Sequence, residues 1–421
     1  MPSRAQTNKG TKIVWMAFAV VLVDMLGVGI LIPIIPLLFT DPDYAYHLNI
    51  SAHNGYLLLG ALTALYPFTM FITMPILGQL SDTFGRRPLL IASLFGTAVS
   101  YALFALGIYL KNIPLMFAAR ALDGLSGANV AVAQAAIADT SSAKERAQKF
   151  GVLAAANGVG FILGPLVGAF LSDSETFQGF GAPTPFLFAA GLCLLNMGAA
   201  IFLFPETIST KTKEYIKFWE GFHHIGAALK DRERRTMYIT TFLFQSGFAF
   251  IITFFGVYLV SRFDFGQRQI GFLFAYVGFL LVITQIGFTR TLSQRVSPRT
   301  SIPISLGVMS IALIGVYFSR TPLMLYVWTI PAAIGTAFTL TNLPALISTS
   351  STEEEQGSVL GINASIQSLA QTIPPLFAGI IAAVFAPTTP VLFAALSVGA
   401  AAIFFLVTNR KRSVRKVLRF Q

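Results

Sequence analysis

Long apolar runs dominate this sequence and limit what it can fold into. A helix of about 20 consecutive apolar residues spans the hydrocarbon core of a bilayer, and hydrophobic residues make up 55% of the 421 residues whereas charged residues make up 11%. We therefore predict an all-α membrane protein with twelve transmembrane helices in two six-helix bundles. The twelve runs are residues 13–39, 55–80, 89–110, 113–138, 147–171, 184–204, 236–261, 268–289, 301–318, 322–348, 358–385 and 388–408.

The basic residues are unevenly distributed between the loops. If both termini lie on one side, that side carries 24 of the 29 Lys and Arg, the opposite loops carry four, and Arg120 lies inside a run. This positive-inside pattern predicts cytoplasmic termini. The positive-inside pattern thus explains the net charge of +11, so we expect contact with the lipid bilayer and no nucleic-acid partner. The basic tail RKRSVRK (410–416) should lie against anionic headgroups. We expect a multi-pass protein of the bacterial inner (cytoplasmic) membrane.

The longest polar break, residues 205–235, divides the chain into two halves. We predict a six-helix bundle over 1–204, a cytoplasmic linker over 205–235, and a second bundle with a basic tail over 236–421. Six plus six spans indicate two repeated halves around a midplane site. A weak internal sequence repeat supports this, because GQLSDTFGRRP (78–88) and TRTLSQRVSPR (289–299) occupy corresponding loops of the two halves. Helical spacing in the linker predicts an amphipathic helix, carried by Phe218, Trp219, Phe222, Ile225 and Leu229.

Three charged residues lie deep within apolar runs: Asp24, Arg120 and Asp123. A charge at bilayer depth is costly, so it usually faces a partner or a water-filled cavity. Arg120 and Asp123 share a helix face at i,i+3 and could form a structural pair. Asp24 has no partner on its own helix. It either pairs with Arg120 across helices or is protonated for part of its working cycle, which makes it the leading candidate for proton coupling.

Amide side chains at helix depth are candidates for lining a substrate cavity. Each could instead be a hydrogen-bonding contact between helices. We select Asn129, Gln134, Asn157, Gln245, Asn342, Asn363 and Gln367.

Several chemistries are excluded by what the sequence lacks. Cys193 is the single cysteine, which excludes a disulfide framework and a Cys-based metal site. The four His all fall in predicted loops, so a membrane-embedded enzyme has no His-based centre. No phosphate-binding G-x-x-x-x-G-K-[ST] loop is present, which excludes an ATP-driven pump within this chain. We expect no enzyme, no metal and no cofactor.

Two runs carry patterned glycine and proline. One is DMLGVGILIPIIP (24–36). The other is NGVGFILGPLVG (157–168), with Gly158, Gly160, Gly164, Pro165 and Gly168. Glycines at such spacings let helix backbones approach closely, and proline bends a helix. The pattern fits helices that re-pack between two states, and it also fits a rigid scaffold.

These residues together resemble the major facilitator superfamily, specifically its twelve-span drug:proton antiporters and most closely the tetracycline/proton antiporters. Four stretches carry the resemblance over most of the chain: DMLGVGILIPIIP, GQLSDTFGRRP, RALDGLSGANVAVAQAAIADT (120–140) and NGVGFILGPLVG. The resemblance implies alternating access powered by a proton gradient. NGVGFILGPLVG is similar to the helix-five motif typical of antiporters.

The resemblance also assigns a role to GQLSDTFGRRP. In the family this loop forms a cytoplasmic latch that favours the outward-open state. Arg86 would pair with Asp82 and with Asp139, and Asp82 would sit near a helix N-terminus of the second half. Gly78 and Gly85 would permit close contact and a tight turn, with Arg87 beside them.

The sequence departs from its nearest relatives at two positions. Tetracycline exporters carry embedded Asp residues in helices three and nine. The corresponding stretches here, GTAVSYALFA with Ser100 and SIPISLGVMSIALIGVYF, carry no acid, whereas Asp123 is an addition. Tetracycline itself is therefore doubtful as the substrate.

We expect proton-coupled efflux of small, partly apolar organic compounds or drugs, by a monomer. The alternative is export of a specific endogenous metabolite or siderophore on the same fold. A non-transporting sensor with this fold is a further reading that only a flux assay separates.

Overall fold

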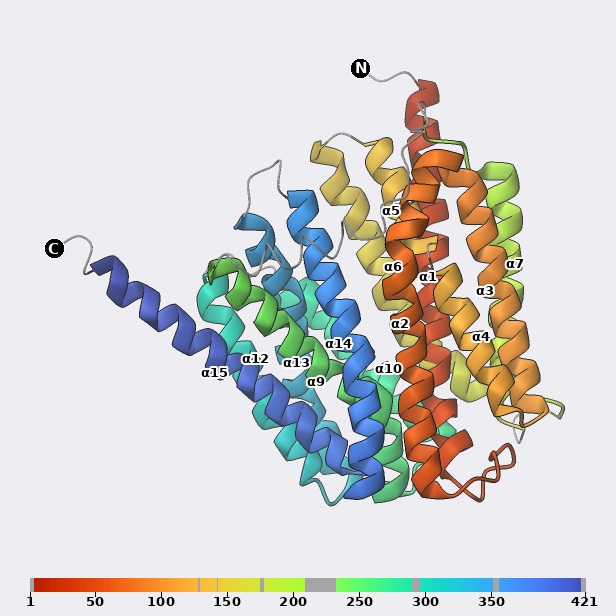
Figure 1. Ribbon diagram of the computed structural model, residues 1–421, viewed down its shortest axis with the longest axis vertical. Helices are drawn as coiled ribbons and strands as arrows, with labels where there is room; N and C mark the ends of the chain where they lie inside the picture. The colour runs from red at the N-terminus through yellow and green to blue at the C-terminus, as the bar shows by residue number, and fades with distance from the viewer. Residues whose placement is uncertain are drawn as a thin grey trace. The chain divides into compact units, whose positions relative to one another are not determined.

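The computed structural model is almost entirely helical over the residues it describes: 4–127, 129–141, 143–174, 178–208, 232–289, 296–350 and 356–417. These ranges contain no strand. Figure 1 shows the helices with the labels used below. They are α1 (Arg4–Thr40), α2 (Ala52–Phe84), α3 (Arg86–Tyr109), α4 (Ile113–Ser126), α5 (Asn129–Asp139), α6 (Ala143–Leu171), α7 (Thr184–Leu203), α9 (Arg232–Phe263), α10 (Gln267–Ile283), the π-helix η1 (Thr284–Thr289), α12 (Pro298–Tyr317), α13 (Pro322–Thr349), α14 (Gln356–Val384) and α15 (Thr389–Val417).

Within the described ranges, ten helices are long and apolar enough to cross a bilayer. The other two predicted runs are covered in pieces. Helices α4 and α5 share the run 113–138, and the 17-residue α10 continues into η1 over the run 268–289. The all-helical class is confirmed, whereas the count of twelve spans and the cytoplasmic side of the termini stay predictions. Pro303 and Pro331 do not interrupt α12 and α13.

The chain divides into two compact units. Unit 1 comprises Met1–Ser51, Leu65–Phe218 and Phe265–Ala275, and unit 2 comprises Ala52–Ala64, Trp219–Asp264 and Tyr276–Gln421. The units differ from the predicted bundles 1–204 and 236–421 in two short segments, the first part of α2 and the first part of α10. The predicted linker boundary at 205–235 stays a prediction. Its amphipathic helix lies outside the described residues.

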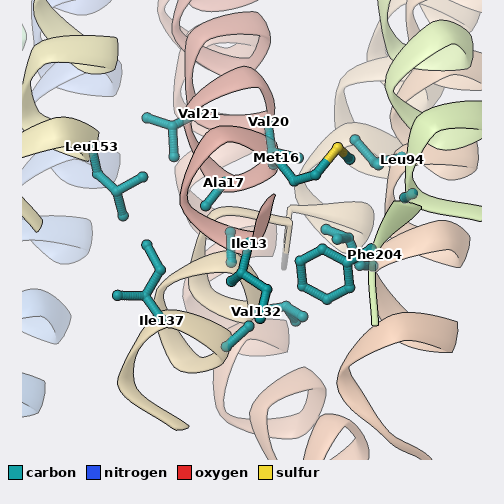
Figure 2. Close-up of a cluster of buried hydrophobic side chains, with 14 of the residues drawn as sticks. Ile13, Met16, Ala17, Val20, Val21, Leu94, Val132, Ile137, Leu153 and Phe204 are labelled. Carbon is teal, nitrogen blue, oxygen red and sulfur yellow. The ribbon is translucent and has the colours of Figure 1, made fainter. Parts of the chain in front are cut away.

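Helix α1 is the central element of unit 1. Of its most apolar stretch, 72% is buried, against 28% for α2, α6 and α7, because a helix that is hydrophobic on all sides belongs inside a bundle. It packs against α5, α6 and α7. Figure 2 shows one buried cluster, in which α1 side chains meet those of α3, α5 and α6 and that of Phe204, directly after α7. Its labelled members are Ile13, Met16, Ala17, Val20, Val21, Leu94, Val132, Ile137, Leu153 and Phe204.

Helix α9 has the same place in unit 2, with 72% of its most apolar stretch buried. It packs against α14 and α15, and α15 also packs against α12. Hydroxyl groups tie these helices together, since Ser397 donates to the Leu243 carbonyl at 2.7 Å and Ser310 donates to the Ala395 carbonyl at 2.8 Å.

The two halves begin corresponding helices in the same way. Helix α3 starts directly after Gly85 and helix α12 directly after Ser297. These two positions correspond when the Leu-Ser pairs at 80–81 and 292–293 of the two loops are aligned. Helices α7 and α15 start with TPFLFAA (184–190) and TPVLFAA (389–395), a stronger repeat that the loop comparison missed. Both observations support two repeated halves.

Candidate functional site

The three predicted intramembrane charges are buried side chains of unit 1. Asp24 lies on α1, and Arg120 and Asp123 lie on α4. Arg120 Nη1 donates to Asp123 Oδ2 at 2.7 Å, so the i,i+3 pair expected from the spacing is formed. An ion pair this deeply buried neutralises both charges at close range.

Asp24 has a neutral partner. The Asn129 amide, at the first turn of α5, donates to Asp24 Oδ1 at 3.2 Å. The Arg120–Asp123 pair acts on Asp24 only through its electric field, in which the repulsion by Asp123 exceeds the attraction by Arg120. The sequence left open whether Asp24 pairs with Arg120 or is protonated for part of its cycle. In the structure its partner is an amide, and its charge has no direct counter-ion among the described residues. This is the chemistry of a carboxyl group that can gain or lose a proton without breaking an ion pair.

Three further residues complete the site, and the sequence reasoning did not select them. The Arg120 guanidinium lies over the Tyr66 ring, 4.7 Å from its centroid, a cation–π contact. The Ser100 side chain is a hydrogen-bond partner of Asp123. Ser100 stands in the stretch where the resemblance implies an acid, so the carboxylate of this region is carried by α4 instead of α3. The phenol of Tyr101 fills the space that a side chain at Gly27 would need.

The remaining predicted amides are spread over both units. In unit 1, Gln134 is exposed on α5, and Asn157 donates to the Leu153 carbonyl of its own helix at 3.1 Å. In unit 2, Asn342 is buried and donates to the Phe338 carbonyl at 3.0 Å. Gln245 and Asn363 are buried and Gln367 is half-buried. Within unit 1, Asn129 is the predicted amide that contacts a charged residue of the site.

The glycine pattern of α6 faces α1. A Cβ at Gly164 would lie 2.7 Å from the Gly29 Cα and 2.8 Å from the Leu26 carbonyl oxygen, and a Cβ at Gly168 would lie 2.8 Å from the Ile30 carbonyl oxygen. Gly160 is equally close to α1. The motif therefore holds the helix that carries Asp24 at backbone contact.

The other two residues of the motif are Gly158 and Pro165. Gly158 is half-buried, and helical geometry directs it away from the face that carries Gly160 and Gly164. Pro165 is inside α6.

The pairs expected for the cytoplasmic latch are present within unit 1. Arg86 Nη1 lies 2.7 Å from Asp82 Oδ1, and Arg86 Nε donates to Asp139 Oδ2 at 3.1 Å.

The other predicted latch residues lie in the last turns of α2 and around the start of α3. Gly85 has a φ of 113°, a left-handed conformation that favours glycine. Gly78 has open space where a side chain would be. Arg87 donates to the Ile201 carbonyl at the end of α7. The latch function and the placement of Asp82 beside the second half stay predictions.

Glu206 and Thr207 belong to the same network, although the sequence reasoning treated them as linker. Glu206 Oε1 accepts from the backbone N–H of Arg86 at 2.9 Å, and Oε2 accepts from that of Arg87 at 3.3 Å. Both N–H groups are in the first turn of α3, where a carboxylate is favoured. Thr207 donates to Asp139 Oδ2 at 3.0 Å. Partial burial raises the pKa of Glu206, but hydrogen bonds from four backbone N–H groups outweigh it and lower the pKa below its usual value.

The described residues offer no cluster of three or more His, Cys, Asp or Glu that could hold a metal ion. The site therefore contains one ion pair, Arg120–Asp123, and one carboxyl group, Asp24, that is hydrogen-bonded to an amide.

Comparisons with known proteins show what the chain is similar to. The family model of the Major Facilitator Superfamily matches residues 17–322 and 237–421. The class B tetracycline resistance protein of Escherichia coli is 28% identical and the match covers 89% of this chain and 88% of that protein. The class C protein of Escherichia coli is 30% identical over 87% and 89%. A crystal structure of a D-xylose–proton symporter shares the fold, with a TM-score of 0.75 at 16% identity over 94% of this chain and 97% of that chain.

Proposed function

Because the chain belongs to the Major Facilitator Superfamily, we propose that it exports small, partly apolar organic compounds or drugs in exchange for protons, by alternating access of its two halves. Its relatives among tetracycline resistance proteins and its apolar helices make it a multi-pass membrane protein and a drug or solute transporter. Such proteins are transporters and not enzymes. We place it in the inner membrane as a monomer with cytoplasmic termini, energised by the proton gradient without a cofactor.

The observation that carries this proposal is the difference between the two buried carboxylates. Asp123 is held by Arg120, whereas Asp24 is held only by the Asn129 amide. An ionised Asp24 accepts the amide hydrogen bond, and it is repelled by Asp123 more than it is attracted by Arg120. A protonated Asp24 is relieved of that net repulsion, so the two protonation states favour different helix arrangements. A substrate that binds only when Asp24 is ionised cannot be bound at the same time as the proton. This mutual exclusion is the coupling step of an antiporter.

Tetracycline is one compound to test, because two relatives are named tetracycline resistance proteins. The missing acid of α3 argues for a different or broader specificity. Ser100 supplies a hydroxyl group where the resemblance implies a carboxylate, and Asp123 supplies the carboxylate from α4, where Arg120 neutralises it. The net charge offered to a ligand is therefore that of Asp24 alone.

Export of one endogenous metabolite or siderophore is the second candidate. It is favoured by amide groups of unit 2 that are buried and unpaired, Gln245 and Asn363, because a selective site needs convergent polar groups. A single transported compound among many tested would favour this candidate.

Proteoliposomes with an imposed pH gradient test the proposal. We expect lipophilic drugs or tetracycline to trigger proton movement, followed with a pH-sensitive dye. Movement triggered only by siderophore-like chelates would favour the second candidate. Asp24→Asn should abolish the coupled flux, and Asp43→Asn, which removes an exposed carboxylate, should preserve it. Coupled flux that survives in Asp24→Asn would contradict the proposed role of Asp24. Flux of none of the compounds would count against drug efflux and favour the second candidate.

A further inference from the structure

Four buried polar side chains of unit 2 have an unmatched hydrogen-bonding group. Thr241, Gln245 and Ser246 of α9 and Asn363 of α14 are at most 6% exposed. Within the described part of the chain, the side-chain oxygen atom of each has no hydrogen-bond partner. Burying a polar group without a partner costs stability, so most buried polar groups in folded proteins are paired.

The neighbouring hydroxyl groups of unit 2 follow the usual pattern. Thr240, directly before Thr241, is fully buried and donates to the Thr236 carbonyl at 2.8 Å. Ser305 and Thr339 are joined at 2.9 Å. Unmatched groups are therefore not a general property of this unit. They are concentrated on α9 and α14.

A hydrogen bond between the two helices brings these residues to one interface. The Tyr238 hydroxyl donates to the Val359 carbonyl at 3.3 Å, and α9 and α14 pack against each other. Thr241 and Gln245 follow Tyr238 by three and seven residues and share its helix face. Asn363 follows Val359 by four residues and shares that face. Helices α10, α12 and α13 lie between them in the chain, so α9 and α14 run in the same direction if successive spans alternate. The unmatched groups then lie at the same level.

The chemistry of unit 2 restricts the ligand to an uncharged group. Every buried polar side chain in the described part of unit 2 is a neutral amide or hydroxyl, whereas the buried Asp and Arg residues lie in unit 1. A charged ligand group beside Thr241, Gln245 and Asn363 would have no fully buried counter-ion among the described residues of unit 2 and would lose its hydration. Amide side chains both donate and accept, so a carboxamide can pair with them through its own N–H and C=O.

We propose that the Thr241, Gln245 and Asn363 groups form a binding subsite for an uncharged carboxamide-type group of the transported compound. The inference rests on the proposed transport function and deepens it. Unit 1 exchanges the proton at Asp24, and unit 2 recognises the substrate by neutral hydrogen bonds. Until the ligand arrives the groups stay unmatched, which lowers the stability of the empty protein and favours binding.

The first experiment measures thermal unfolding of the purified full-length chain without ligand. Thr241→Val, Gln245→Leu and Asn363→Leu should leave the unfolding midpoint unchanged or raise it, because each removes an unmatched group. Thr240→Val is the matched control and should lower the midpoint, because its hydroxyl group is paired. If all four variants lower the midpoint alike, permanently bound water satisfies these groups and the subsite is refuted. This result does not depend on proton flux, so it separates failure of the subsite from failure of the transport proposal.

The second experiment measures binding to the same proteins by equilibrium dialysis. The probes are 2-naphthamide and 2-isopropylnaphthalene, which have a similar shape but differ in hydrogen bonding. We expect Gln245→Leu and Asn363→Leu to weaken binding of 2-naphthamide about 10-fold and to leave 2-isopropylnaphthalene unchanged. Thr240→Val should bind both probes like the unmodified protein. Equal weakening of both probes, no change for either, or no 2-naphthamide binding to the unmodified protein would overturn the proposal.

Discussion

At the level of single residues, the partner of each buried polar group decides its role. Asp123 and Asp24 are both carboxylates at helix depth, but one is bound to a guanidinium group and the other to an amide. The sequence could identify both, because acidic residues in apolar runs are rare. It could not assign the partners, because Tyr66, Ser100 and Asn129 come from other helices and only the fold brings them together.

Glu206 gives a prediction at this scale. The Glu206 carboxylate accepts hydrogen bonds from the first backbone N–H groups of α3, and Glu206→Gln removes its negative charge. We therefore expect a lower unfolding midpoint at pH 7. The pKa of Glu206 is lowered in the folded protein. Its contribution is therefore present above the unfolded-state pKa and is lost as the pH falls through the folded-state pKa. The difference between variant and unmodified protein should vanish in thermal unfolding experiments as the pH is lowered from 7 to about 3.

The control for this prediction is Asp43→Asn, because Asp43 is exposed. Its midpoint should follow that of the unmodified protein at every pH. A Glu206→Gln effect that is the same at pH 7 and at the acidic end would show that the carboxylate charge does not act on α3.

At the level of elements, backbone proximity between α1 and α6 positions the titratable carboxyl group. Gly29 and Gly164 occur where the helix backbones touch, and Pro165 follows at once. The sequence predicted this close approach from glycine spacing alone, and it predicted most helix bounds to within a few residues from the length of the apolar runs. It did not reveal that the fourth run is divided into α4 and α5, because composition changes little around Gly127.

Glycine substitutions on α6 test this packing. A Cβ at Gly164 would lie 2.7 Å from the Gly29 Cα, so Gly164→Ala should force the helices apart. We expect a loss of about 1–3 kcal/mol in unfolding free energy and reduced substrate-driven proton flux. Gly151→Ala is the matched control on the same helix, because nothing lies within 4 Å of its Cβ position. It should be neutral or stabilising, since alanine favours a helix over glycine. Equal effects of the two variants would refute a role for the close approach.

At the level of the whole molecule, the two halves repeat a helix plan but differ in chemistry. The repeat is visible in the starts of α3 and α12 and of α7 and α15. Among the described residues, the buried charges are confined to unit 1, and unit 2 buries only neutral polar groups. Charge and hydropathy predicted the helical class and the three buried charged residues on α1 and α4. The unmatched amides of unit 2 could not be predicted, because a sequence shows which polar residues are buried far better than it shows which remain unpaired.

The central claim is that Asp24 carries the exchanged proton, and proton release on substrate binding tests it most directly. The purified protein in weakly buffered detergent solution receives a transported compound, and a pH-sensitive dye follows the protons released. We expect release by the unmodified protein and by Asp43→Asn, and none by Asp24→Asn. Undiminished proton release from an Asp24→Asn protein that still binds the compound would place the exchanged proton on another group and refute the role of Asp24.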